Sequence, residues 1–137
     1  SMSMLLEMSD AGASTHIVKD IDPADPTVLW RWTRQNPTVK ILAVTTRDLK
    51  LTVDFSLWDV AFQQTGPVEL TFAVNGHTLD KIRYTSPGEK HFEKPIPPEW
   101  LFSDVESTIS VAIDKLYTAP QDGAKFGFIL SRIGFSR

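Results

Sequence analysis

The chain has 137 residues, of which 42% are hydrophobic, with a formal net charge of -3 at pH 7 and a pI near 5.5. This length supports one domain with a sizeable core. The charge gives no basic field that would gather phosphates, and basic side chains between residues 31 and 50 are interleaved with aspartates, so we expect solvated side chains and no nucleic-acid partner. The lack of cysteine excludes disulfides and thiolate chemistry but leaves the compartment open, with the cytoplasm slightly favoured.

The predicted elements begin after residue 14. Residues 1–14 are mixed and small, and residues 1–4 resemble a cleavage scar followed by a start codon. The apolar pair at residues 5–6 is too short for the core of a signal peptide, and no segment approaches the length of a membrane span. We therefore expect a tag and a flexible N-terminal arm at residues 1–14 and a single domain at residues 15–137.

Alternation of apolar and polar residues predicts strands in the N-terminal half, since it is typical of a sheet buried on one face. Prolines within residues 22–26 end the first strand because each removes a hydrogen-bond donor. In the second strand Trp30 and Trp32 share one face. The other face carries Arg31 and Thr33, and the sequence does not say whether it meets solvent or a second sheet. The predicted strands are residues 15–20, 28–33, 38–44 and 49–55.

The second half continues in the same way. Residues 57–65 indicate a longer loop, and the Asn-Gly pair at residues 75–76 predicts a two-residue hairpin turn because both residues tolerate positive φ. Proline-rich residues 95–102 predict an extended segment with one helical turn, and a change of phase predicts a bulge near residues 131–132. The further predicted strands are residues 67–74, 78–84, 89–94, 108–114 and 125–135.

About nine short strands with a single helical turn predict an all-β fold. The leading architecture is a two-layer antiparallel β-sandwich of jelly-roll type, which would occupy residues 15–137. A closed barrel is the alternative.

Residue types that carry catalysis or bind metals are scattered. The histidines His16, His77 and His91 lack the close spacing of metal ligands, and the acidic residues within 20–25 lack the EF-hand pattern. No G-x-S-x-G elbow, phosphate loop or dinucleotide fingerprint is present. We therefore predict no catalytic residue, no metal and no cofactor. An enzyme would need a pocket that joins His77 or His91 to a carboxylate across strands.

Aromatic side chains are the remaining clue, since sugar rings stack on flat aromatic rings while their hydroxyls pair with Asp, Asn and Arg. A small sandwich also needs large residues for its core, so we expect most of the tryptophan and tyrosine side chains of this chain to be buried. Trp58 and Trp100 lie in predicted loops, where they serve as exposed platforms or as lids over the core. The candidate ligand-binding residues are Trp58, Trp100, Tyr84, Arg34, Asn75, His77 and Asp122.

Several short motifs together resemble a known group of domains. They are Trp30-Arg31-Trp32-Thr33, Val74-Asn75-Gly76, the approach to a strand through Pro97, and residues 119–123 followed by Phe126-Gly127-Phe128 and Ile133. They resemble the small β-sandwich accessory domains attached to bacterial glycosyltransferases and related cell-envelope enzymes. Lys125 stands where that pattern carries arginine. The resemblance implies a non-catalytic module that binds glycan or docks against a neighbouring enzyme domain, and it lends no catalytic residue.

The sequence thus favours a carbohydrate-binding-like β-sandwich module, accessory to a glycan-handling enzyme. The alternative is a structural or protein-interaction domain, whose apolar patch would meet a neighbouring domain or a second copy in a homo-oligomer. The residues expected in that patch are Leu57, Trp58, Phe62 and Phe102. Burial of all four tryptophans, with no groove that has an aromatic floor, would exclude the first hypothesis.

Overall fold

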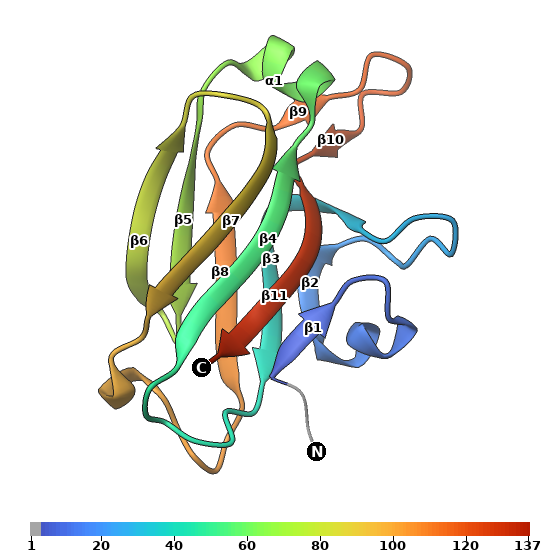
Figure 1. Cartoon of the computed structure of the whole chain (residues 1–137). Coiled ribbons are helices and arrows are strands. Elements are labelled where there is room, and N and C mark those ends of the chain that lie inside the picture. Colours follow the sequence, from blue (N-terminus) through green and yellow to red (C-terminus); the bar gives the residue numbers. More distant parts are fainter. Residues whose placement is uncertain (1–3) are drawn as a thin grey trace.

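Two antiparallel sheets pack face to face in the computed structural model, which describes residues 4–137 (Figure 1). The front sheet contains, in spatial order, β1 (Leu5–Glu7), β11 (Ile129–Ser136), β4 (Lys50–Leu57) and β7 (Gly88–Pro95). The back sheet contains β2 (Ile17–Ile21), β3 (Arg31–Ile41), β8 (Ser107–Ile113), β5 (Val68–Val74) and β6 (His77–Tyr84). The first residues of β11 also pair with β3, which joins the sheets along one side. At one end of the sandwich, β9 (Tyr117–Thr118) and β10 (Lys125–Phe126) lie beside helix α1 (Asp59–Thr65).

The core between the sheets is filled by alternate side chains of each strand, as the predicted period of two requires. The inward side chains of β4, each at most 5% exposed, are Leu51, Val53, Phe55 and Leu57. Phe72 of β5 stacks on Phe92 of β7 with ring centroids 3.8 Å apart, so an aromatic pair connects the two layers. Burying one such side chain stabilises the fold by roughly 2 kcal/mol. The predicted all-β sandwich is confirmed.

Three local predictions are also confirmed. Asn75 and Gly76 have φ values of 49° and 81°, which form the tight turn between β5 and β6. The single helical turn is present as η2 (Pro98–Trp100). The register of β11 against β4 shifts between Leu130 and Arg132, which is the predicted bulge. Among residues 4–137, no helix has the length and apolarity needed to cross a bilayer.

Residues 57–65 contain helix α1, so the prediction of a loop there is wrong. Trp58 occupies the N-cap, Asp59 places a carboxylate in the first turn, and Gly66 ends the helix with a φ of 70°. A helix of 7 residues spans about two turns, which is too short for a hydrophobic period to be recognised. Its stability comes from packing, through the buried side chain of Ala61.

The strand break predicted between residues 33 and 38 is also wrong, because β3 runs continuously from Arg31 to Ile41. The backbone N–H of Asn36 donates to Oδ2 of Asp20 at 2.9 Å, and the register between β2 and β3 shifts on both sides of Lys19. A side-chain acceptor thus replaces a ladder hydrogen bond where the strand passes Pro37.

Residues 5–14, expected to lie in a flexible arm, contain β1 and most of a 3₁₀ helix, η1 (Ala11–His16), and Met8 between these elements is fully buried. The guanidinium of Arg31 binds this segment, because Nε donates to the carbonyl of Met8 at 2.9 Å and Nη2 to that of Asp10 at 3.0 Å. Arg31 is 2% exposed, so the expectation that it is solvated is wrong. The side of β3 that carries Arg31 therefore faces inward.

Candidate functional site

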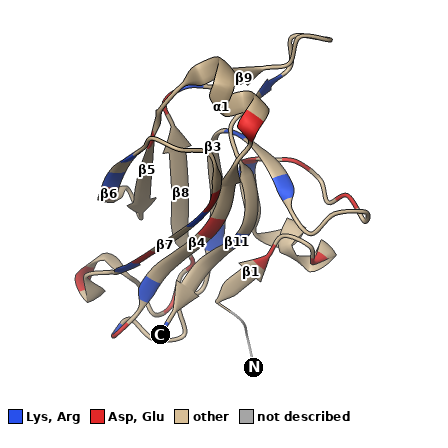
Figure 2. Cartoon of the chain, turned by 45° about the horizontal axis from the view of Figure 1, so that its top comes forward, with Lys and Arg blue, Asp and Glu red and all other residues tan. Residues whose placement is uncertain are grey.

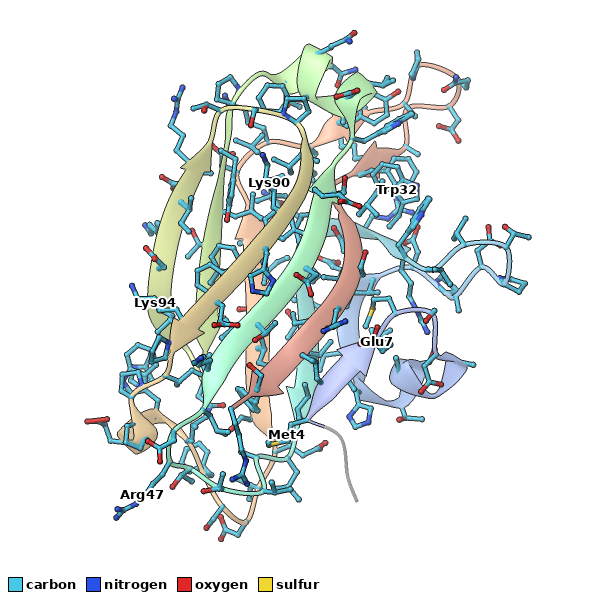
Figure 3. The ribbon with its side chains drawn as sticks, in the orientation of Figure 1. Met4, Glu7, Trp32, Arg47, Lys90 and Lys94 are labelled. Carbon is cyan, nitrogen blue, oxygen red and sulfur yellow. The ribbon has the colours of Figure 1, made fainter. Side chains whose placement is uncertain are left out.

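A groove crosses the outer surface of the front sheet, and all four strands of that sheet contribute to it. Its volume is about 640 Å³. The segment between β2 and β3 forms a wall through Trp30 and Leu29, and Leu29 is 77% exposed. Glu7 of β1 and Lys90 of β7, labelled in Figure 3, line the groove from the two edges of the sheet. The polar side chains of the floor are Asp54, Ser56, Glu89, His91, Ser131 and Arg132.

A second hollow, of about 660 Å³, lies over the turn before β4 and the end of β7. It is lined by residues 46–50, Pro95, Ile96 and Pro98, none of which is aromatic. The groove on the front sheet is therefore the better candidate for a ligand with a ring to stack.

Alternating charges cross the floor of the groove from strand to strand, and Figure 2 shows acidic and basic positions side by side on these strands. Nε of Arg132 lies 2.8 Å from Oε2 of Glu7 and 3.7 Å from Oδ2 of Asp54. Oδ1 of Asp54 is hydrogen-bonded to Nδ1 of His91. Nε2 of His91 lies 3.5 Å from Oε1 of Glu93. We call this row of five side chains the charge ladder; it presents N–H donors and carboxylate acceptors next to one another.

The charge ladder follows from the register of the strands. Glu7 pairs with Arg132 across β1 and β11. Arg132 pairs with Asp54 across β11 and β4, and Asp54 with His91 across β4 and β7. The sequence shows only that these residues occupy polar positions of separate strands, because cross-strand pairing between distant segments leaves no local pattern. The signal that the sequence offered for the charge ladder was that its residues alternate with buried residues along their strands.

Trp30 is held in the wall of the groove by a series of aromatic contacts. Its ring packs edge to face on Trp32 at 6.0 Å, and Trp32 packs in the same way on Trp58 at 5.6 Å. Phe126 contacts Trp32 at 5.1 Å, and the guanidinium of Arg34 lies 4.3 Å from the centre of the Phe126 ring. Trp32, labelled in Figure 3, thus connects the wall to the end of the sandwich that carries β10.

Two of the seven residues predicted to bind ligand, Trp58 and Arg34, belong to this aromatic support rather than to the lining of the groove. Trp58 is 39% exposed, so the four tryptophans are not all buried. Arg34 also forms an ion pair with Asp22 at 3.0 Å. Asp122 lies between β9 and β10, where its carboxylate accepts from the N–H of Ala124 at 2.9 Å and closes its own loop.

Tyr84 lies at the end of β6 and is half-buried, with its ring 5.4 Å from that of Phe55. Burial, with the nearby charge of Asp80 as a smaller contribution, raises the pKa of Tyr84 to about 12. Its hydroxyl therefore stays protonated at physiological pH.

The other three predicted residues meet at the opposite end of the sandwich from α1 (Figure 1). The imidazole of His77 stacks on the indole of Trp100 with centroids 4.8 Å apart. Nδ2 of Asn75 donates to the carbonyl of Trp100 at 2.7 Å, and its Oδ1 accepts from the N–H of Thr108 at 2.8 Å. The structure therefore brings Asn75, His77 and Trp100 together, away from the groove, and a binding role for them stays a prediction.

His91 is expected to titrate above its ordinary value. The hydrogen bond that His91 donates to the carboxylate of Asp54 raises the pKa of His91 above 6.5, with smaller contributions from Glu93. A raised pKa in the folded state means that this interaction stabilises the fold fully below the unfolded value and is lost as the pH rises through the folded value. An NMR titration of the His91 ring should show this raised pKa, and the substitution Asp54→Asn should lower it. An unchanged titration midpoint in that variant would contradict the assignment of the shift to Asp54.

The groove does join His91 to a carboxylate across strands, the arrangement required for catalysis. Both ring nitrogens face carboxylates, however, and neither Ser56 nor Ser131, which also line the groove, is hydrogen-bonded to the ring. Within residues 4–137, no three His, Asp or Glu side chains are grouped to hold a metal ion. What the described residues offer a ligand is hydrogen bonding and an aromatic surface.

Two solved structures share this fold at low sequence identity. A family 35 carbohydrate binding module from an environmental isolate has a TM-score of 0.55 and 12% identity, over 97% of this chain and 92% of that chain. A family 35 carbohydrate binding module from Clostridium thermocellum has a TM-score of 0.53 and 9% identity, over 90% of this chain and 92% of that chain. Neither a protein-family model nor a curated protein matches the chain. At these identities the likeness shows the fold.

Proposed function

We propose that this chain is a non-catalytic module that binds glycan in the groove on its front sheet. The observation that carries the proposal is that Trp30 stands in the wall of a groove whose floor contains Asp54, His91 and Arg132 of the charge ladder. Sugar rings need both elements, because their C–H faces pack on an aromatic ring while their hydroxyls need donors and acceptors. The fold shared with two carbohydrate binding modules supports this choice.

The floor is accessible enough to serve a ligand. The side chains of Asp54, Arg132 and His91 are 29%, 43% and 56% exposed, so each keeps hydrogen-bonding capacity toward solvent. Asp54 supplies acceptors and Arg132 supplies donors at neighbouring positions, which suits two adjacent hydroxyls of a sugar. Because the ion pairs hold these side chains in place, less conformational entropy is lost on binding.

A glycan array followed by titration of tryptophan fluorescence tests the proposal. We expect saturable binding that Trp30→Ala weakens at least tenfold, a loss of about 1.4 kcal/mol or more. Asp54→Asn, which removes a charge from the floor and keeps the shape, should also weaken binding. Phe102→Ala, which removes a 49% exposed aromatic side chain outside the groove, is the control and should bind as the wild type does. Binding that survives both groove substitutions, or an array without a single saturable ligand, would refute the proposal.

We further infer that the module accompanies a glycan-handling enzyme and holds that enzyme near its substrate. The resemblance to accessory β-sandwich domains supports this role, as does the near-complete coverage of two modules of similar size. If the role is correct, the chain fused to an enzyme active on the bound glycan should raise turnover of the insoluble polymer, and Trp30→Ala should remove the gain. An equal gain with that variant would count against it.

The alternative, a protein-interaction domain, has less support. Leu57 is 5% exposed and Phe62 is only partly exposed, so they offer little surface. Trp58 precedes α1, whereas Phe102 follows η2 at the far end of the sandwich (Figure 1). The four residues therefore do not form one patch.

A further inference from the structure

We propose that the groove binds an extended chain of several sugar units, laid across the strands of the front sheet from the wall at Trp30 to the edge strand β7. This inference rests on the proposed function and deepens it, since it names linear oligosaccharides and polysaccharides, rather than single sugars, as the ligand. It is carried by the shape of the groove, by the position of its wall and by the line of polar side chains on its floor.

The groove is longer across the strands than along them. Its lining extends from Glu7 of β1 to Glu89 of β7, so it crosses the whole front sheet. Three intervals separate these two strands, which is about 14 Å at the usual strand spacing. Along β4 the lining covers only residues 54–56, or about 7 Å of strand. The groove is therefore elongated, and its long axis is perpendicular to the strands.

The wall of the groove stands at one end of this long axis. Ile129 of β11 pairs with Ser56 of β4 on one side and with Trp32 of β3 on the other. Trp30 directly precedes β3 and lines the groove, so it stands beside β11 on the side away from β4 and β7. An aromatic ring in this place can hold one sugar unit by stacking while the rest of the chain lies along the floor.

The floor repeats its hydrogen-bonding groups from strand to strand. Cross-strand pairing places four members of the charge ladder in one line, in the order Glu7, Arg132, Asp54 and His91. A carboxylate thus alternates with a side chain that carries N–H groups. A pyranose unit extends a linear chain by about one strand spacing, so about three units fit between the wall and β7. Each of these units would meet a new donor and a new acceptor.

The other end of the groove is an edge of the sheet. Among residues 4–137, β7 pairs with β4 alone, and the lining contains no residue from beyond β7. Glu89 is exposed at this end, and the side chain of His91 is 56% exposed. A chain anchored at Trp30 therefore reaches Glu89 only when it is long enough, and a longer chain can extend past the sheet.

Chain length is the variable that tests this inference. The probes for calorimetric titration of the purified chain are xylose, mannose, glucose and their linear oligomers up to the hexasaccharide. We expect any series that binds to gain at least tenfold in affinity from the disaccharide to the tetrasaccharide, and less than twofold from there to the hexasaccharide. A monosaccharide that binds as tightly as its hexasaccharide would overturn the extended mode and leave glycan binding intact. Failure of every series, and of the glycan array, would overturn the proposed function as well.

Three variants locate the two ends of the bound chain. Trp30→Ala should weaken binding of the disaccharide and the hexasaccharide alike, because both need the stacking contact. Glu89→Ala should weaken binding of the hexasaccharide at least threefold and leave that of the disaccharide within twofold, since the disaccharide stops short of β7. Glu106→Ala makes the same change on an exposed loop residue outside the groove and should leave both affinities as in the wild type. Equal effects of Glu89→Ala on the two ligands, or no effect on the hexasaccharide, would overturn the proposed course of the chain.

Discussion

Replacing Arg31 with methionine is expected to lower the free energy of unfolding by about 3 kcal/mol, because a buried charged donor group with one buried and two partly buried acceptors is lost. Besides the carbonyls of Met8 and Asp10, the guanidinium reaches Oγ of Ser14 at 3.0 Å. Methionine fills much of the same volume but donates no hydrogen bond, so the carbonyl of Met8 would remain buried without its donor. The substitution therefore tests the loss of hydrogen bonds rather than a change in packing.

Urea unfolding and thermal melts measure this loss, which corresponds to roughly 10 °C in melting temperature for a domain of this size. Arg83→Met, the same substitution on the exposed strand β6, is the control and should change stability by less than about 0.5 kcal/mol. If Arg31→Met were no more costly than Arg83→Met, the guanidinium would not be what holds residues 8–14 against the sandwich.

The same residue connects stability to the groove. Arg31 binds the segment that directly follows β1, and the lining of the groove contains Glu7 at the end of β1 and Ser9 in that segment. Loosening it should remove one end of the charge ladder from Arg132. We therefore expect Arg31→Met to weaken glycan binding even at temperatures where the sandwich stays folded.

Local features were predictable from the sequence because their causes lie within a few residues. The turn at Asn75 and Gly76 depends on two residues that accept positive φ, and the bulge near Arg132 is visible as a change of phase along one strand. The alternation on β4 gave its buried face directly. Together these features define strands and turns, and hence an all-β sandwich.

The groove could not be predicted in the same way, because it depends on which strands become neighbours. Glu7 and Arg132 stand near opposite ends of the chain and meet only because β1 pairs with β11. The inward orientation of Arg31 likewise depends on residues 8–14 folding over it. The sequence predicted a tryptophan at the binding site. It selected Trp58 and Trp100 because they lie in predicted loops, whereas the tryptophan that lines the groove is Trp30.

Gly127→Ala is expected to destabilise the fold by about 3 kcal/mol, because the added methyl group has no room. Its Cβ would lie 2.3 Å from the carbonyl oxygen of Arg34 and 3.0 Å from Oγ1 of Thr33. The first of these is a backbone atom, and the backbone here is fixed by hydrogen bonds: N–H of Gly127 donates to the carbonyl of Thr33 at 2.8 Å, and that of Phe128 to Oγ1 of Thr33 at 3.0 Å. Relief requires the start of β11 to move away from β3.

A movement of the start of β11 should also affect ligand binding. Phe126 precedes Gly127 and supports Trp32, which in turn supports Trp30 in the wall of the groove. We expect Gly127→Ala to weaken binding of any glycan that binds the wild type and to shift the tryptophan emission, as measured by calorimetry and fluorescence on the folded variant. Gly12→Ala is the control, since its Cβ meets only the exposed side chain of Asp10, at 3.2 Å. Weakened binding in both variants would show that the effect does not pass through the aromatic support, whereas loss in Gly127→Ala alone would connect the junction of the two sheets to the binding site.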